Sequence, residues 1–251
     1  MEVIEVSKRN KYIYHISAQH IDFQKNVTLS SLFHLIMKTA GLDADKRGFG
    51  VLRLQTEDYT WVLSRFVLDI ERFPKEDEQI SIETWIEDVQ TMFTTRNFRI
   101  TNGGGKLIGY ATSSWAVIDI NTRRSVLLDT LPSMQDYILP EPTPIGMPMR
   151  IPNVRGEIAN DFKVKYSHID VNGHASSPYY IQWLADCFPL DFYVNHKLKR
   201  FEINFLREIT FGDKGEVNRE MKDENDYYFQ ISTEDKGVSC RARMQFADIE
   251  V

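Results

Sequence analysis

The chain has 251 residues, of which 42% are hydrophobic and 26% are charged, an ordinary composition for a globular protein with a sizeable core. Its formal net charge of -6 argues against nucleic acid as a partner, because phosphate backbones are bound by basic surfaces. No apolar run approaches the length that crosses a bilayer, so we expect no membrane partner.

The N-terminus and the cysteines both indicate a cytoplasmic protein. The first residues, MEVIEVSKRNKY, contain no apolar stretch followed by a small-residue cleavage site, so we expect no secretory signal. Cys187 and Cys240 lack the spacing of a metal site and lie in apolar patterns. We expect both to be buried free thiols.

The first predicted elements are a strand and a long helix, and this pair occurs twice. When the chain is slid against itself so that His20-Ile21-Asp22 lies on His168-Ile169-Asp170, the flanking patterns also coincide. Upstream, alternate residues are apolar in both copies, the period of a strand. Downstream, positions 29, 32, 33, 36 and 40, and again 180, 181, 184 and 188, follow the spacing of a buried helix face. We expect Thr28 and Ser177 to cap the two helices, with Pro178 at the first helical position of the second.

β-rich sequence follows each helix, which extends the repeat. In the first half the segments are 60–73, 79–89, 95–101 and 108–120, and in the second half they are 200–209, 227–233 and 238–249. Asn102-Gly103-Gly104-Gly105 supplies a hairpin turn. Arg65-Phe66 matches Arg200-Phe201, so the strand that follows the helix has corresponding residues in the two halves. The sequence therefore predicts an internal duplication.

A proline-rich segment separates the copies. Six of the nine prolines lie between Pro132 and Pro152, and proline cannot continue a helix or a central strand. We expect residues 131–160 to form an extended surface connector between units at 1–130 and 161–251. Each unit is predicted to be a long helix wrapped by a curved antiparallel sheet, and two units side by side would share one continuous sheet. The fold class is α+β.

The loops that enter the two helices differ in their polar residues. The first contains Asp22, Gln24 and Asn26, whereas the second reads Asp170-Val171-Asn172-Gly173-His174. Histidine has an ordinary pKa near 6.5, which suits proton transfer at neutral pH. The free N–H groups of a helix start can hold a developing oxyanion. The second loop is therefore the predicted site of chemistry.

The segment DVNGHASSPYYIQW resembles the signature of the acyl-acyl carrier protein thioesterases of plant plastids and bacteria. In the first half WVLSRFVLDIERFP, ETW and NTRRS match that family's pattern, and in the second half FLREI matches the segment with its catalytic acid. The resemblance implies a tandem double hot-dog fold, no cofactor, and hydrolysis of fatty acyl-acyl carrier protein (acyl-ACP). Carried over residue by residue, it implies the catalytic set Asp170, Asn172, His174 and Glu208.

Two departures from the family pattern change the expected chemistry. Family members usually continue His-Val-Asn-Asn, whereas this chain has His174-Ala175-Ser176-Ser177. Plant members have a cysteine after the acid, where this chain has Ile209, so a cysteine nucleophile at that site is excluded. We expect Glu208 to activate water, directly or through His174.

The remaining site residues follow from that mechanism. We expect the Gly173 N–H and its neighbours to face the thioester oxygen, and Ser176 and Ser177 to contact substrate. Asp170 would hold His174 or the loop in place, and Asn172 would position substrate or water. His168, Asp170 and His174 are not followed by a second pair of ligands with the spacing of a metal site, so we expect no metal here.

Structural explanations for the same residues remain open from the sequence. Asp170 can serve as a turn residue like Asp22, and His174 can be structural. Glu208 can form a surface ion pair with Arg207.

The first copy is predicted to bind the acyl chain. Trp61, Phe66 and Trp85 are candidates for the side chain that ends the acyl tunnel. The carrier protein is acidic, so we expect a basic docking patch at His196–Arg200 or at Arg123-Arg124.

Three other functions remain open: an acyl-coenzyme A thioesterase, a non-catalytic acyl-binding sensor, and a dehydratase of the same fold. The sequence also leaves open a homodimer and the preferred chain length.

Overall fold

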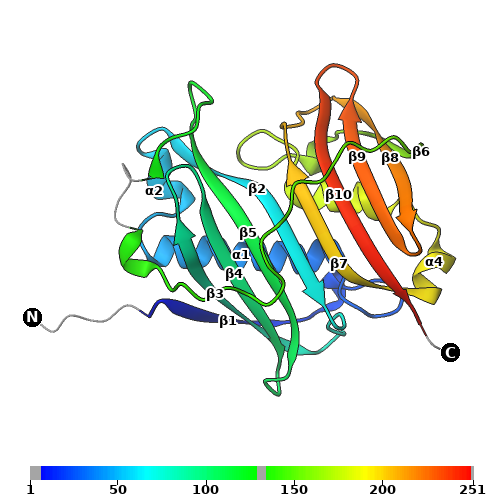
Figure 1. Cartoon of the computed structure of the whole chain (residues 1–251), viewed down its shortest axis with the longest axis horizontal. Helices are drawn as coiled ribbons and strands as arrows, with labels where there is room; N and C mark the ends of the chain where they lie inside the picture. The colour runs from blue at the N-terminus through cyan, green and yellow to red at the C-terminus, as the bar shows by residue number, and fades with distance from the viewer. Residues whose placement is uncertain (1–6, 129–133, 250–251) are drawn as a thin grey trace, which may run out of the picture.

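The computed structural model describes residues 7–128 and 134–249. Its strands form one antiparallel sheet of 10 strands in the order β1-β3-β4-β5-β2-β7-β10-β9-β8-β6. The long helix α1 lies behind this sheet in the view of Figure 1. Within the described ranges no helix is long and apolar enough to cross a membrane.

The two halves contain the same sequence of elements. The first half comprises β1 (Arg9–His15), η1 (Ala18–His20), α1 (Leu29–Lys46), α2 (Val51–Gln55), β2 (Tyr59–Ile70), β3 (Gln79–Val89), β4 (Thr94–Asn102) and β5 (Leu107–Asp119). The connector contains η3 (Gln135–Tyr137). The second half comprises β6 (Glu157–Lys163), η4 (Tyr166–His168), α3 (Ser177–Ala185), α4 (Leu190–Asn195), β7 (His196–Phe205), β8 (Lys214–Asp223), β9 (Asp226–Thr233) and β10 (Gly237–Asp248).

The halves meet at β2 and β7, the first strand after the helices in each half. Arg65 lies opposite Asn204, and Asp69 lies opposite Arg200. Arg65 and Arg200 are counterparts in the duplication, and so are Asp69 and Asn204. The pairing therefore exchanges equivalent residues, which is the contact pattern of a two-fold axis. The predicted continuous sheet of two side-by-side units is confirmed.

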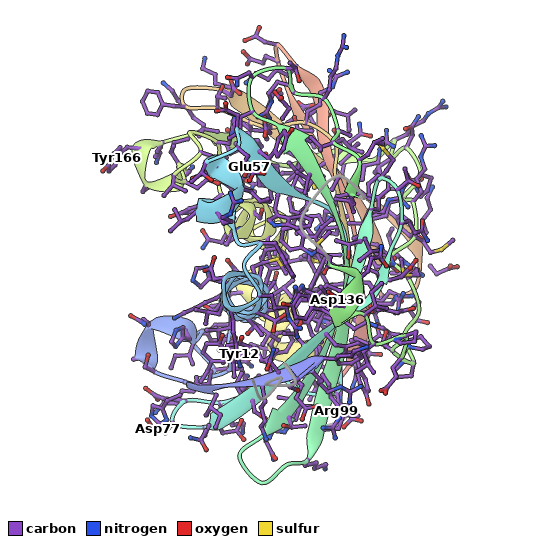
Figure 2. The ribbon with its side chains drawn as sticks, turned by 90° about the vertical axis from the view of Figure 1, so that its left-hand side faces the viewer. Tyr12, Glu57, Asp77, Arg99, Asp136 and Tyr166 are labelled. Atoms are coloured by element: carbon purple, nitrogen blue, oxygen red, sulfur yellow. The ribbon has the colours of Figure 1, made fainter. Side chains whose placement is uncertain are left out.

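Helix α1 lies inside the curve of the sheet, as Figure 2 shows in a view along the helix. Its predicted cap is confirmed, because the Thr28 hydroxyl accepts a hydrogen bond from the backbone N–H of Ser31. Ser30 Oγ donates to the carbonyl of Pro178, its counterpart 148 positions later, over 3.0 Å. The two helix starts therefore contact each other near the two-fold axis.

The second helix differs from its prediction at both ends. Ser176 is the residue before the helix and Ser177 is its first residue, so Pro178 is second. The helix ends after 9 residues, and Phe188 lies beyond it although its spacing predicted a helical position. Pro189 explains the early end, because a proline pushes the residue before it out of the α region. The chain then turns into α4.

One apolar core runs through both halves. Phe33 of α1 lies edge-on to Phe66 of β2 with ring centroids 5.0 Å apart, and Phe66 lies 6.4 Å from Phe201 of β7. All three side chains are fully buried. Cys187 and Cys240 are buried in the same core and unpaired, as predicted.

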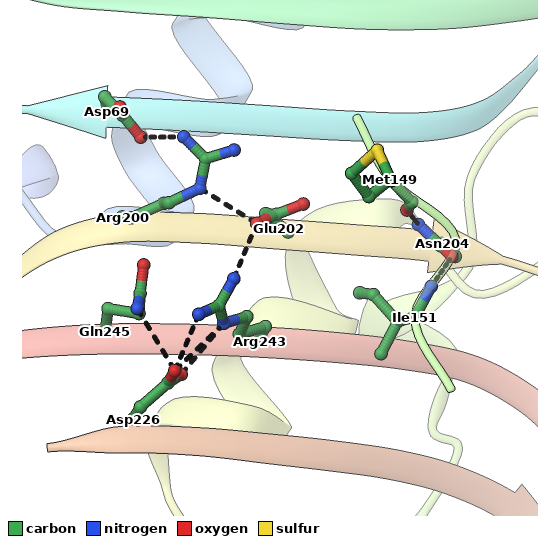
Figure 3. A network of polar contacts seen from close by, with 9 residues as sticks. All are labelled: Asp69, Met149, Ile151, Arg200, Glu202, Asn204, Asp226, Arg243 and Gln245. Carbon is green, nitrogen blue, oxygen red and sulfur yellow. Dashed lines mark hydrogen bonds and ion pairs between the residues drawn. The ribbon is translucent and has the colours of Figure 1, made fainter. Parts of the chain in front are cut away.

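The connector crosses the face of the sheet opposite α1 (Figure 1). Asn204 of β7 anchors it, since its Oδ1 accepts from the N–H of Ile151 over 2.8 Å and its Nδ2 donates to the carbonyl of Met149 over 3.1 Å (Figure 3). Trp85 Nε1 donates to the carbonyl of Glu141 over 2.7 Å. The connector is thus fixed to the sheet by hydrogen bonds to side chains.

The limits of the connector differ from the sequence expectation. Strand β6 begins at Glu157, so the last residues of the range 131–160 belong to the sheet of the second half and not to the connector, and η3 adds a short helical turn near its start. The predicted start of the connector at residue 131 and the first proline of its run, Pro132, lie outside the described residues.

Candidate active site

Asp170 organises the loop that enters α3. Its Oδ1 accepts from the backbone N–H of Asn172 over 2.8 Å and from that of His174 over 3.4 Å. In the first half, Asp22 Oδ1 accepts in the same way from Gln24 and Asn26, both over 2.9 Å. Asp170 therefore holds the loop, in a turn that both copies share.

Gly173 is explained by that turn. Its φ is 80°, and Lys25 at the equivalent place has a φ of 62°, so the turn needs a left-handed residue in both copies. The N–H of Gly173 donates to the carbonyl of Asp170 over 3.0 Å. The turn therefore already uses the N–H that was expected to face a thioester oxygen.

The loop is paired with the segment that carries Glu208. The N–H of Ala175 donates to the carbonyl of Ile209 over 2.8 Å, and His174 forms a β-bridge with Thr210. The N–H of Ile209 donates to the hydroxyl of the buried Tyr180 over 3.2 Å. Burial raises the pKa of the Tyr180 hydroxyl, so the tyrosine stays protonated. These contacts bring Glu208 next to His174.

His174 and Glu208 form the predicted pair. His174 Nε2 lies 3.2 Å from Glu208 Oε2, and both side chains are partly exposed. An imidazole and a carboxylate at this separation can hold a water molecule and move its proton. Arg207 does not pair with Glu208, because its Nη1 donates to the carbonyl of Lys236 instead.

Two side chains from the first half reach this site. Arg123, in the turn after β5, forms an ion pair with Glu208. Gln55, the last residue of α2, donates from Nε2 to Asn172 Oδ1 over 3.4 Å. Neither contact was predicted, although Arg123 stands in the NTRRS segment on which the family resemblance partly rests. Spacing along the chain gives no indication of a contact between residues so far apart.

The site opens into a cleft of about 540 Å³ between the halves. Asp170, Asn172, His174 and Glu208 all line it. Of the residues expected to contact substrate, Ser177 lines the cleft, whereas Gly173 and Ser176 are not among its lining residues. Within the described chain, the N–H of Ser177 has no hydrogen-bond partner. It is therefore the free donor at the start of α3.

A second, apolar cavity of about 150 Å³ lies within the first half. Residues of α1, α2 and strands β2 to β5 line it, among them Met37, Ala40, Ala44, Val51, Trp61, Ile86 and Trp115. Trp61 also lines the cleft, so this residue borders both spaces.

The other two aromatic candidates for the tunnel end have different positions. Phe66 fills the core between Phe33 and Phe201. Trp85 is bonded to the connector, and the guanidinium of Arg9 lies 4.2 Å from its ring centroid. Neither lines the cavity or the cleft.

The two predicted basic patches are largely engaged in contacts within the chain. Arg200 bridges Asp69 and Glu202 over 2.7 and 2.8 Å (Figure 3), and Lys199 Nζ donates to a backbone carbonyl over 3.1 Å. Both arginines of the second patch are exposed, but Arg123 contacts Glu208, which leaves Arg124 as the one without a side-chain partner among the described residues.

His168 has a structural role in this chain. Its Nδ1 accepts from the N–H of Lys165 over 3.3 Å, as His20 Nδ1 accepts from the N–H of Ser17 over 3.1 Å in the first copy. Across residues 7–128 and 134–249, no cluster of three or more His, Cys, Asp or Glu side chains has the geometry to hold a metal ion.

Comparison with known families and sequences gives a consistent result. The family model described as the acyl-ACP thioesterase N-terminal domain matches residues 7–130, and the model of the C-terminal domain matches residues 152–248. The oleoyl-acyl carrier protein thioesterase 2, chloroplastic, of Arabidopsis thaliana is 24% identical over 228 residues, which are 82% of this chain and 61% of the relative. The chain therefore spans about three fifths of that relative's length.

Solved structures show the same architecture. An acyl-ACP thioesterase from Bacteroides thetaiotaomicron is 36% identical with a TM-score of 0.90, over 96% of this chain and 98% of the other. The 12:0-ACP thioesterase from Umbellularia californica has a TM-score of 0.85 at 15% identity, over 97% of this chain and 99% of the other. The predicted tandem double hot-dog fold is confirmed. With both family models matched in order along most of its length, the chain belongs to the acyl-ACP thioesterase family.

Proposed function

We propose that this protein hydrolyses the thioester of fatty acyl-ACP, releases the free fatty acid and so ends chain elongation. The observation that carries the proposal is the separation of 3.2 Å between His174 Nε2 and Glu208 Oε2 in a cleft that shares Trp61 with an apolar cavity. A proton-transfer pair beside an apolar cavity suits a polar reaction on the end of a fatty chain.

In this mechanism Glu208 accepts a proton from water, and the water oxygen attacks the thioester carbonyl carbon. The carbonyl oxygen becomes an oxyanion, for which the free N–H of Ser177 at the start of α3 is the proposed donor. The carbon–sulfur bond then breaks, and the sulfur takes the proton back through His174. The products are a fatty acid and the thiol of the carrier's arm.

The catalytic set keeps separate roles in this scheme. Asp170 acts through the loop, because its carboxylate holds the backbone of Asn172 and His174. The Asn172 side chain faces the cleft and is proposed to orient the water or the thioester. Ile209 follows the acid, so no cysteine is available there as a nucleophile.

We propose a division of labour between the halves. The first, residues 1–130, would bind the acyl chain in its apolar cavity, and the second, residues 161–251, would carry the catalytic loop. Each buried methylene contributes about 0.8 kcal/mol to binding, so affinity should rise with chain length until the cavity is filled.

The proposed partner is an acyl carrier protein in the cytoplasm. Both cysteines are free and buried, which supports a reducing compartment.

The test is release of free thiol from acyl-ACP substrates of graded chain length, beside matched acyl-coenzyme A esters. Faster release from the carrier substrate, with a maximum at one chain length, is the expected result. A preference for coenzyme A would assign the protein to acyl-coenzyme A instead. Tight acyl binding without thiol release from either substrate would refute the hydrolase and favour an acyl-binding sensor.

A further inference from the structure

Arg123 connects the first half to the catalytic carboxylate of the second. Its Nη2 contacts Glu208 Oε2, the same oxygen that lies 3.2 Å from His174 Nε2. Arg123 lines the cleft together with these two residues. The carboxylate therefore has one neighbour from each half of the molecule.

The backbone at Arg123 is held in a conformation that residues with a Cβ rarely adopt. Its φ is 59°, in the left-handed region. The turn after β5 imposes this φ: the N–H of Arg123 donates to the carbonyl of Asp119 over 2.9 Å, and Asp119 Oδ1 accepts from the N–H groups of Asn121 and Thr122 over 2.9 and 2.7 Å. Glycine or asparagine would fit this turn at lower cost, so an arginine here is a strained choice that a role for its side chain would explain.

We infer that Arg123 is a positioning residue for Glu208, an inference that rests on the proposed function. With Arg123 and His174 both at Oε2, the other carboxylate oxygen has no hydrogen-bond partner among the described residues. That oxygen is the one left to accept the proton of the attacking water. The guanidinium thus fixes the rotation of the carboxylate, and the first half contributes to catalysis as well as to binding.

The neighbouring arginine provides a matched control. Arg124 carries the same charge one residue later, and its backbone carbonyl accepts from the N–H of Asp119 over 2.9 Å. Its side chain is exposed and makes no hydrogen bond or ion pair with any described residue. A role in attracting an acidic carrier protein would be shared by both arginines, whereas positioning belongs to Arg123 alone.

The experiment measures kcat and KM for Arg123→Gln, Arg123→Lys and Arg124→Gln, on acyl-ACP and on acyl-coenzyme A of the same chain length. Arg123→Gln should lower kcat about tenfold to a hundredfold on both substrates, because a misplaced catalytic group costs up to that factor. Its KM should stay within about twofold, Arg123→Lys should recover part of the loss, and Arg124→Gln should keep the wild-type kcat. Adding Arg123→Gln to Glu208→Gln should cause no further loss, because the arginine acts through the carboxylate.

Three results would overturn the inference. A rise in KM for acyl-ACP alone, with kcat unchanged, would assign Arg123 to docking. A loss of kcat that matches a loss of folded protein in thermal melts would make the contact structural. If Arg123→Gln lowers kcat by the same factor in the Glu208→Gln background as in the wild type, Arg123 acts independently of Glu208. If the wild type itself releases no thiol from either substrate, the proposed function fails first, and the role of Arg123 fails with it.

Discussion

The indole Nε1 of Trp61 donates a hydrogen bond to the backbone carbonyl of Phe49 over 2.8 Å. The two rings also meet edge to face, with centroids 6.4 Å apart. These contacts hold the indole of Trp61, the residue that borders both the cleft and the apolar cavity of the first half. In the proposed function, an acyl chain attached to a thioester in the cleft would pass Trp61 to enter the cavity.

Replacing Trp61 with leucine should move the preferred acyl chain to greater length. The smaller side chain opens the boundary, and each additional buried methylene is worth about 0.8 kcal/mol, or roughly fourfold in kcat/KM. The measurement is kcat/KM across a series of acyl chain lengths. Trp85→Leu is the matched control, since Trp85 borders neither space. An unchanged maximum in Trp61→Leu would rule out Trp61 as the limit.

His174→Ala and Glu208→Gln should each lower kcat at least about a hundredfold, the usual contribution of a general base. Asn26→Ala serves as the control, because Asn26 is the counterpart of His174 in the first half and lies outside the cleft. It should keep the wild-type rate. Near-normal turnover in both site variants would show that the pair has no catalytic role.

Asp170→Asn should retain most of the activity that Asp170→Ala loses. The asparagine oxygen can still accept from the N–H groups of Asn172 and His174, whereas alanine leaves both without a partner. We expect Asp170→Ala to cost roughly 1–2 kcal/mol of stability and about tenfold or more in kcat. Asp22→Ala should lower the thermal midpoint in the same way and leave kcat unchanged. A complete loss of kcat in Asp170→Asn would show that the negative charge itself is needed.

Neither cysteine should react with iodoacetamide in the folded protein. Burial raises the pKa of the Cys187 thiol to about 12 and also raises the pKa of Cys240, so almost no reactive thiolate forms near neutral pH. Mass spectrometry should detect alkylation only after denaturation, and treated enzyme should retain its activity. Rapid labelling of the native protein would contradict the buried positions.

Asp43→Ala should destabilise the first half strongly. Asp43 Oδ2 pairs with Arg47 Nε over 2.8 Å and with Arg96 Nη1 over 2.6 Å, and all three side chains are buried. Removing the carboxylate leaves two buried positive charges without this countercharge, which costs about 3–5 kcal/mol. The free energy of unfolding in urea measures this loss. Asp45→Ala, at an exposed position of the same helix, should change it little.

The same cluster should make stability depend on acid pH. Burial alone would raise the pKa of Asp43, but the charge of Arg96 and the hydrogen bonds from Arg47, Arg96 and Asn10 outweigh it and lower that pKa. The carboxylate therefore contributes fully above the ordinary carboxyl range, and the contribution is lost as pH falls through the lowered value. Thermal melts of wild type and Asp43→Asn should converge in acid and separate toward neutral pH. A constant difference at all pH values would contradict this.

The sequence alone predicted those features of the fold and of the site that depend on the local pattern of residues. The repeated His-Ile-Asp and the helix spacing predicted two equivalent units, and the loop comparison singled out His174. The length of α3 was predicted incorrectly, because Pro189 ends the helix while the apolar spacing continues to Phe188. The turn role of Gly173 became visible only when its φ could be compared with that of Lys25.

The contacts between the halves could not be predicted from local pattern. Arg123 and Glu208 are 85 positions apart, and Gln55 and Asn172 are 117 positions apart. They meet because β2 pairs with β7 across the middle of the sheet, and no periodicity within either half specifies that pairing. From the sequence, Arg123 was accordingly predicted only as part of a basic docking patch, and its contact with Glu208 was missed.

The exchange of equivalent residues at the β2–β7 seam has a consequence for how such a protein can evolve. Two separate but identical copies joined at this seam would have two identical loops, and any change in one would appear in both. Once the copies share one chain, each loop can mutate alone. The loop at Asp22 has kept its turn without a histidine, while Arg123 and Gln55 serve the loop at Asp170. In a fused chain each half can therefore diverge on its own, as the different polar residues of the two loops illustrate.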